Sequence, residues 1–137
     1  MTTMSRAAAV AALTTLALAA STAGSQAAGR DWKTLSTFDG GKIQACKVAT
    51  TDTGPWKIKL RVDATKATGK VNGTAFVTKN DNPDGDHWKS GWVAKGKISD
   101  VGTVTLPRGK AYALGAGIGS TDAGNGGSFT AGDIRGC

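Results

Sequence analysis

The stretch "KNDNPDGDHW" (Lys79–Trp88) holds three of the ten acidic residues of the chain and its only histidine. Four of its residues match positions 1, 3, 5 and 6 of a calcium-binding loop: Asn80, Asn82, Asp84 and Gly85. That loop also needs an acid at position 1 and a bidentate Glu at position 12, where this chain has Gly91. The stretch therefore predicts a polar turn at Asn82–Gly85, and irregular calcium binding by three acids is left open: Asp81, Asp84 and Asp86.

A single histidine, His87, restricts the enzyme classes that the chain could serve. A Ser-His-Asp hydrolase would have to use it, but no G-x-S-x-G elbow presents a serine. A zinc site would lack ligands, and a glycosidase needs two carboxylates across a cleft, whereas these acids share one turn. The sequence predicts no enzyme, no catalytic residue, no metal ligand and no cofactor.

The elements that carry these residues show a period of two. In "WKIKLRVD" (Trp56–Asp63) apolar and charged residues alternate, as in a half-buried antiparallel strand. Every acid is Asp and there are 20 glycines, which argues against helices. We expect an all-β fold, a single small antiparallel β-sandwich of about eight short strands, and a small barrel stays open. The expected strands are Trp32–Phe38, Lys42–Thr50, Trp56–Asp63, Thr68–Asn80, Asp86–Val93, Val101–Pro107, Lys110–Ile118 and Gly127–Ile134.

The chain has two cysteines, Cys46 and Cys137. In an oxidising compartment two cysteines in one small domain are most simply paired. The bridge would close a segment of 137 − 46 = 91 residues, which is worth roughly 4–5 kcal/mol in the chain-entropy model. We predict one disulfide that ties down the C-terminal segment.

The N-terminal residues have the pattern of an export signal. One positive charge, Arg6, precedes the uncharged apolar run Ala7–Ala20, and small residues follow up to a cleavage site after Ala27. We therefore expect a signal peptide over residues 1–27, a β-sandwich domain over residues 28–137, secretion, and no membrane span.

A basic strand face is the first binding candidate. Alternation places Lys57, Lys59 and Arg61 on one side of a strand, with Lys42 and Lys47 as further members. The excess of 17 Lys and Arg over 10 Asp favours anionic wall polymers or glycans, whereas no nucleic-acid signature accompanies these bases. A solvated strand face explains the same pattern.

Two tryptophans form a second candidate. In "HWKSGWV", alternation places Trp88 and Trp92 on the same side of one strand, where two rings could stack a sugar. Two core tryptophans explain the same spacing.

The tract "GAGIGSTDAGNGG" (Gly115–Gly127) lacks the order of a phosphate-binding loop. Glycines alternating along a strand mark bends or the close approach of another backbone. The tract therefore favours a flat surface on which a partner chain can dock.

The arrangement "FDGGKIQACKV…WKIKLRVD…HWKSGWV…GTVTLP…GNGG…C" resembles small exported actinobacterial proteins of unassigned activity. These are similar in size and export to the small adaptor subunit of umbrella-like secreted toxin particles. The resemblance implies a compact adaptor that links a lectin-bearing arm to a repeat scaffold.

Together these features predict a non-enzymatic secreted protein–protein interaction module, as a subunit or adaptor of an extracellular assembly or as an inhibitor. The alternative is a cell-wall or glycan-binding module that uses the basic face.

Overall fold

The computed structural model describes residues 31–137, and the predicted signal peptide lies outside these described residues. Eight strands and one short 3₁₀ helix follow one another: β1 (Lys33–Phe38), β2 (Gly41–Ala49), β3 (Trp56–Asp63), β4 (Val71–Lys79), β5 (Asn82–Val93), β6 (Gly102–Leu106), β7 (Tyr112–Gly119), β8 (Gly124–Phe129) and η1 (Ala131–Asp133). The expected all-β fold is confirmed. No helix in this part of the chain is long and apolar enough to cross a membrane.

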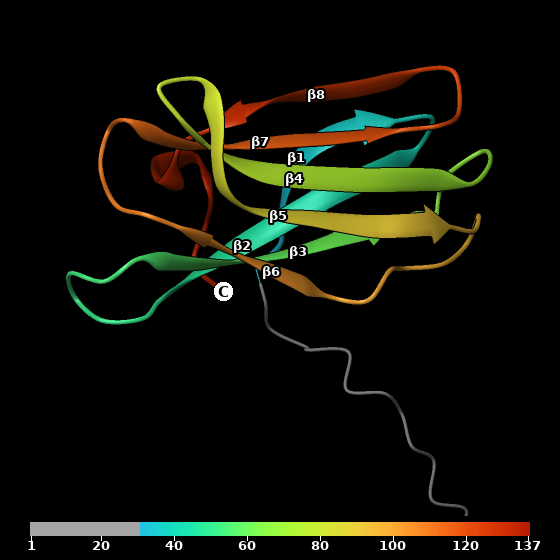
Figure 1. Ribbon diagram of the computed structural model, residues 1–137. Helices are drawn as coiled ribbons and strands as arrows, with labels where there is room; N and C mark the ends of the chain where they lie inside the picture. The colour runs from blue at the N-terminus through green and yellow to red at the C-terminus, as the bar shows by residue number, and fades with distance from the viewer. Residues whose placement is uncertain (1–30) are drawn as a thin grey trace, which may run out of the picture.

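The strands form two four-stranded antiparallel sheets, ordered β1-β2-β3-β6 and β5-β4-β7-β8. The sheets lie one over the other, with their strands running obliquely to each other (Figure 1). A side-chain hydrogen bond joins them at each edge. Asn125 Nδ2 on β8 donates to Thr37 O on β1 (3.2 Å), and Asp86 Oδ2 on β5 accepts from Thr105 N on β6 (2.9 Å). The domain is therefore a β-sandwich, as predicted.

The core lies between the sheets and follows from the alternation of apolar residues. Ile58, Leu60 and Val62 of β3 point inward and are fully buried. The opposite sheet contributes Val71, Ala75, Val77, Leu114, Ala116 and Ile118, all of which are buried. Each fully buried Val, Leu or Ile contributes about 1.5–3 kcal/mol relative to its exposed state. Strand alternation alone thus decides which residues build this core.

The β4–β5 hairpin turns two residues earlier than the sequence predicts. Its turn is Asn80-Asp81, with φ of 49° and 63°, and Lys79 pairs with Asn82. A two-residue turn with both φ values positive matches the right-handed twist of the flanking strands, and Asn and Asp tolerate this conformation. The predicted turn Asn82–Gly85 is therefore wrong: these residues begin β5, an edge strand that tolerates Pro83.

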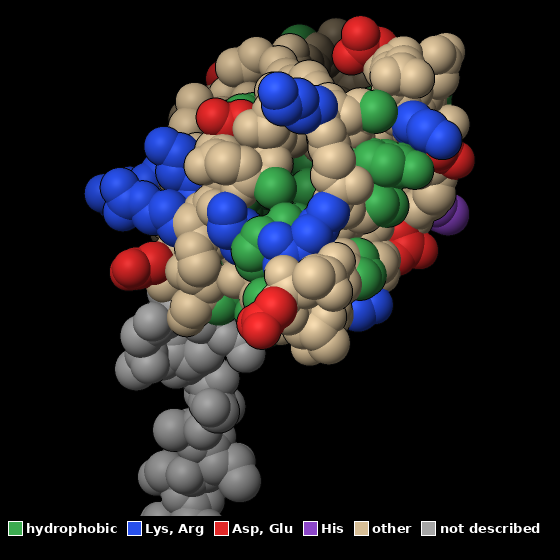
Figure 2. All heavy atoms as spheres, turned by 90° about the vertical axis from the view of Figure 1, so that its left-hand side faces the viewer, with side chains coloured by type: hydrophobic (Ala, Val, Ile, Leu, Met, Phe, Trp, Pro, Cys, Tyr) green, Lys and Arg blue, Asp and Glu red, His purple; other side chains and the backbone are tan. Residues whose placement is uncertain are grey.

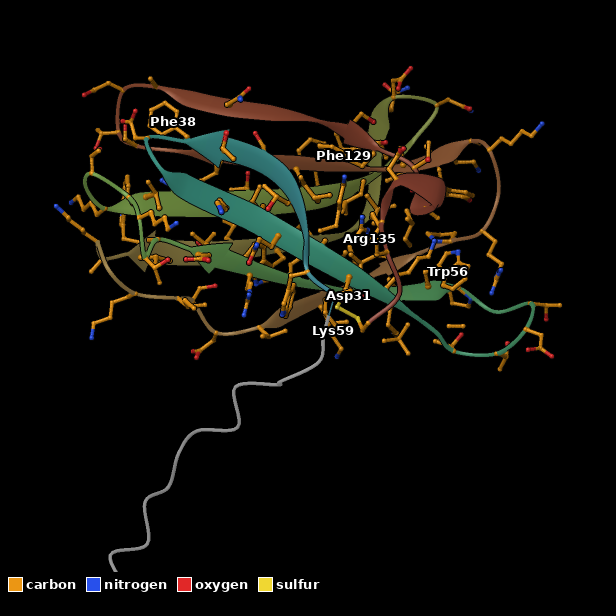
Figure 3. The ribbon with its side chains drawn as sticks, turned by 180° about the vertical axis from the view of Figure 1, so that it is seen from behind. Asp31, Phe38, Trp56, Lys59, Phe129 and Arg135 are labelled. Atoms are coloured by element: carbon orange, nitrogen blue, oxygen red, sulfur yellow. A yellow bond between two sulfur atoms is a disulfide. The ribbon has the colours of Figure 1, made fainter. Side chains whose placement is uncertain are left out.

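The C-terminal segment completes the first sheet. β1 pairs with β2 only as far as Ala45, and beyond that point Lys47 N donates to Arg135 O (2.8 Å) while Cys137 N donates to Lys47 O (2.9 Å). The predicted disulfide Cys46–Cys137 is present, with a Cα–Cα distance of 5.0 Å (Figure 3). Ile134, 1% exposed, fills the adjacent end of the core. The tail thus acts as a short strand held covalently beside β2.

Candidate functional site

The predicted basic face lies on the outer side of the β1-β2-β3-β6 sheet. β3 alternates, so Lys57, Lys59 and Arg61 face away from the core that Ile58, Leu60 and Val62 enter. Lys57 Nζ donates to Thr105 Oγ1 (2.7 Å) and Lys59 Nζ to Thr103 Oγ1 (2.9 Å), both on neighbouring β6. The structure brings the three predicted residues together on one face. Their side chains already make hydrogen bonds to residues of the neighbouring strands.

Arg61 is the most restrained member of this face. Its Nε donates to Gln44 Oε1 (2.9 Å), and its guanidinium carbon lies 4.3 Å from the centre of the Trp32 ring. Partial burial lowers the pKa of Arg61, against the opposing charge of Asp63. The guanidinium of Arg61 therefore mainly joins β3 to its neighbours and is less available to a ligand than a free cation would be.

Lys47 does not belong to the basic face, contrary to the sequence prediction, whereas Lys42 does. In the β2–β3 register Lys47 lies opposite Ile58, an inward residue, and Lys42 lies opposite the outward Asp63. Lys47 therefore points between the sheets at one end of the sandwich, where its ammonium lies 4.9 Å from the centre of the Trp56 ring.

The prediction that Trp88 and Trp92 share one side of a strand is wrong. Residues 72 to 74 of β4 lie opposite residues 89 to 92 of β5, so β5 carries one extra residue at a bulge where Gly91 has φ 66°. An extra residue reverses the alternation. Trp88 lies opposite buried Ala75 and packs against the core, whereas Trp92 points outward and is 51% exposed. The two rings form no common platform.

The outer side of the other sheet is nearly free of side chains over β7 and β8, whereas β5 carries His87 and Lys89 on this side. Its outward positions on β7 and β8 are largely glycine, so backbone lies at the surface. We call this surface the glycine face and define it by Asn72, Thr74, Phe76, Gly115, Gly117, Gly119, Gly124, Gly126 and Trp92. It contains a shallow depression of about 420 Å³ over β4, β7 and β8.

Phe76 is the aromatic side chain at the centre of the glycine face. It is 40% exposed, and its ring lies on Gly115, where a Cβ atom would come within 2.6 Å of Cζ. Trp92 adds a second exposed ring, with Lys70 Nζ 4.9 Å from its centre. The sequence indicated a flat surface here but missed Phe76. The pairing of β4 with a glycine strand is the signal that would have shown it.

The acidic stretch has a structural role. Asp86 accepts the hydrogen bond from Thr105 N that joins β5 to β6, and this bond lowers the pKa of Asp86. His87 is exposed on the outer side of β5, opposite Phe76. Within residues 31–137, no three His, Cys, Asp or Glu side chains gather as a metal site. The calcium hypothesis gains no geometric support from the described residues.

A cavity that sequence reasoning missed lies at one end of the sandwich. It has a volume of about 470 Å³ and lies where the β6–β7 loop, β3, β7 and η1 meet. Figure 2 faces this end of the molecule, where Lys and Arg side chains surround exposed apolar atoms. The turn "PRGK" (Pro107–Lys110), which places two bases beside strand-borne aromatics, is the only sequence signal for it.

No protein-family model, no curated protein and no solved structure matches this chain. The functional argument therefore rests on the arrangement of the described residues. Three regions present distinct chemistry: the basic face, the glycine face and the end cavity.

Proposed function

We propose that this protein is exported and acts as a non-enzymatic protein–protein interaction module, docking through the glycine face. The observation that carries the proposal is the exposure of Phe76 and Trp92, 40% and 51%, beside a surface of glycine backbone. Aromatic anchors are typical of the centre of a protein interface, and the cations on this side, Lys89 and Lys70, lie towards its β5 edge.

The glycine face is inexpensive to desolvate. Its backbone groups are already bonded in the ladders that join β4, β7 and β8, and glycine has no side-chain entropy to lose on binding. A partner can therefore approach β7 and β8 closely without displacing long side chains. Phe76 is held on Gly115 in advance, which reduces the ordering cost of binding.

Export is supported by the disulfide between Cys46 and Cys137, since such bonds persist in oxidising compartments. The role that fits a small rigid domain with one docking face is that of a subunit or adaptor in an extracellular assembly, or of an inhibitor. The resemblance to the adaptor of secreted toxin particles belongs to this proposal.

A second candidate function is binding of an anionic wall polymer or glycan through the basic face. It is favoured by one observation: β3 places Lys57, Lys59 and Arg61 on a single outward side, joined by Lys42 of β2. Such binding would be electrostatic and would weaken as salt screens the charges.

The test of the first proposal compares matched double variants on opposite sides of the sandwich. The purified protein is immobilised and exposed to native culture supernatant, and retained proteins are identified and quantified by mass spectrometry. We expect a stoichiometric partner that is lost in Phe76→Ser/Trp92→Ser and kept in Lys57→Gln/Lys59→Gln. Recovery of no stoichiometric partner, or its retention by Phe76→Ser/Trp92→Ser, contradicts the proposal.

Sedimentation with isolated cell walls tests the second candidate. Binding at low salt should fall in Lys57→Gln/Lys59→Gln and on addition of salt, and should persist in Phe76→Ser/Trp92→Ser. If the protein stays in the supernatant at low salt, wall binding is wrong.

A further inference from the structure

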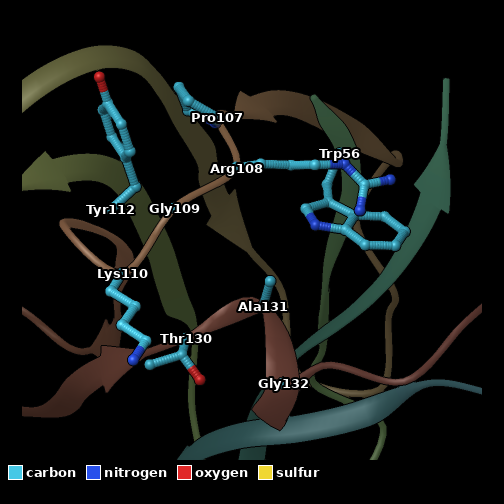
Figure 4. A pocket seen from close by; sticks show the side chains of 9 residues that line it. All are labelled: Trp56, Pro107, Arg108, Gly109, Lys110, Tyr112, Thr130, Ala131 and Gly132. Atoms are coloured by element: carbon cyan, nitrogen blue, oxygen red, sulfur yellow. The ribbon is translucent and has the colours of Figure 1, made fainter. Parts of the chain in front are cut away.

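The end cavity combines aromatic and cationic side chains. Trp56 at the start of β3 and Tyr112 at the start of β7 lie across it from each other, as Figure 4 shows. The remaining lining residues are Pro107, Arg108, Gly109, Lys110, Thr130, Ala131 and Gly132. None of these described lining residues is acidic, so the side-chain charge of the lining is positive.

Arg108 is held in a fixed position in this cavity. Its guanidinium lies over the Trp56 ring, 4.1 Å from the centre (Figure 4). Its Nε donates to Gly54 O (2.5 Å) and its Nη2 to Thr51 O (3.2 Å), both in the β2–β3 loop. A guanidinium has five N–H donors, so three have no partner among residues 31–137 and can bind an anion.

Lys110 provides a second cation. Its side chain extends towards Thr130 in Figure 4, and its ammonium donates no hydrogen bond within residues 31–137. Two further cations lie on the aromatic walls: Lys47 Nζ is 4.9 Å from the Trp56 ring centre and Lys79 Nζ is 5.6 Å from that of Tyr112. The field in the cavity therefore favours a negative ligand.

The carboxylate of Asp133, which follows the lining residue Gly132, is hydrogen-bonded at the start of η1. Asp133 of η1 accepts hydrogen bonds from both Thr130 N and Thr130 Oγ1 at 2.8 Å, and these bonds lower the pKa of Asp133. Its carboxylate is thus committed to holding the start of η1, which forms one wall of the cavity.

We propose that the end cavity binds a small organic acid: a six-membered ring that bears a carboxylate. The ring lies over Ala131, between the Trp56 and Tyr112 ends of the cavity, and the carboxylate accepts hydrogen bonds from Arg108. Lys110, on the opposite side of the cavity in Figure 4, adds positive charge to the site. Sugar acids and aromatic acids share this chemistry. The site is separate from the glycine face and the basic face, and it goes beyond the proposed docking function.

The test is a titration followed by two-dimensional ¹⁵N NMR with matched acid and neutral ligands. D-glucuronate is paired with D-glucose, and 4-hydroxyphenylacetate with 4-hydroxyphenylethanol. We expect saturable shifts of the Trp56 indole N–H and of the Lys110–Tyr112 and Thr130–Gly132 amides with an acid. The neutral counterpart should bind at least about tenfold more weakly than the acid, because it lacks the charge-assisted hydrogen bonds. A response to one acid alone identifies the ligand source.

Two single variants locate the anion. Arg108→Gln should weaken acid binding about tenfold. Lys110→Gln, which removes no hydrogen bond from the described fold, should weaken it by a smaller factor, because it removes only a more distant charge. Lys95→Gln/Lys97→Gln lowers the net charge at two exposed residues of the β5–β6 connection and should bind as the parent does. Three results would each overturn the proposal: no saturable shift with either acid, equal binding of acid and neutral ligands, or parent-like binding by both single variants. An equal loss in the control double variant would likewise overturn it, because the attraction would then be non-specific.

Discussion

The two outer faces of this sandwich have the same backbone architecture and opposite surfaces. On the β1-β2-β3-β6 sheet, long polar side chains bond across strands, as Lys57 does to Thr105 and Arg61 to Gln44. On the β5-β4-β7-β8 sheet, glycines leave backbone exposed around Phe76 and Trp92. The difference shows that a sheet face is best judged by whether its side chains have partners within the fold.

This contrast is one of desolvation. A partner that covers the basic face has to remove water from ammonium and guanidinium groups, which is costly. A partner that covers the glycine face removes water from aromatic rings and from peptide groups already bonded in the sheet. Two sheets of four strands each therefore present different outer faces: one is suited to remain in water, and the other to be covered by a partner protein.

The largest expected effect on stability comes from removing the disulfide, which is found only in the sheet that carries the basic face. Cys46→Ser/Cys137→Ser should lower the free energy of unfolding by about 2–5 kcal/mol, because the unfolded chain regains the freedom of a 91-residue loop. Urea unfolding, with the parent protein measured in parallel with and without reductant, checks this. A loss below about 1 kcal/mol would contradict the proposed stabilisation of the tail.

The next effect probes how Phe76 is held on the glycine face. Gly115→Ala should cost about 1–3 kcal/mol, because its Cβ would lie 2.6 Å from Phe76 Cζ and the ring has to move. In a Phe76→Ala background the same change should be nearly neutral. Urea unfolding of the four proteins in this cycle measures the coupling. Equal costs of Gly115→Ala in both backgrounds would show that Gly115 does not position the ring.

The basic face should tolerate substitution. Lys57→Ala/Lys59→Ala removes two partly exposed hydrogen bonds to Thr105 and Thr103, and we expect a loss of no more than about 1 kcal/mol. Thermal unfolding at low and high salt measures it. A loss of several kcal/mol would mean that this face is needed for the fold, and the contrast between the faces would fail.

The smallest effect concerns acid stability at the β5–β6 edge. The hydrogen bond from Thr105 N lowers the pKa of Asp86 below the ordinary value for an aspartate, about 3.9. Its contribution is therefore complete above that pH and is lost as the pH falls through the folded pKa. Asp86→Asn should lose less stability than the parent between roughly pH 5 and pH 2. Urea unfolding across this range checks it, with Asp84→Asn as the control, which should follow the parent.

Strand alternation and cysteine pairing were the parts of the fold that the sequence made predictable. Trp56–Asp63 forms the strand with the predicted bounds because each of its inward residues is apolar and each neighbour charged. The disulfide followed from the presence of two cysteines alone. The first inference needs only the alternation of apolar and charged residues along the strand, and the second only the number of cysteines. Neither depends on how the sheets are assembled.

Two of the errors, on the hairpin turn and on Trp92, have one physical origin, the irregularities of β5. The bulge at Gly91 reversed the side on which Trp92 lies. The chain turns at Asn80-Asp81, although Pro83 and Gly85 are the stronger turn signals in the sequence. Alternation cannot reveal an extra residue, because the bulge is defined by the partner strand. The end cavity was missed for a related reason: Trp56, Arg108 and Thr130 meet only after both sheets have packed.

The tail beside β2 sets an order of events for the folding chain. Lys47 reaches its final hydrogen bonds only with Arg135 and Cys137, and Ile134 closes the core at the same end. During synthesis from the N-terminus, this end of the core therefore cannot close until nearly ninety residues after Lys47 have been added. Closure between such distant segments makes the last residues of the domain the ones that complete its folding.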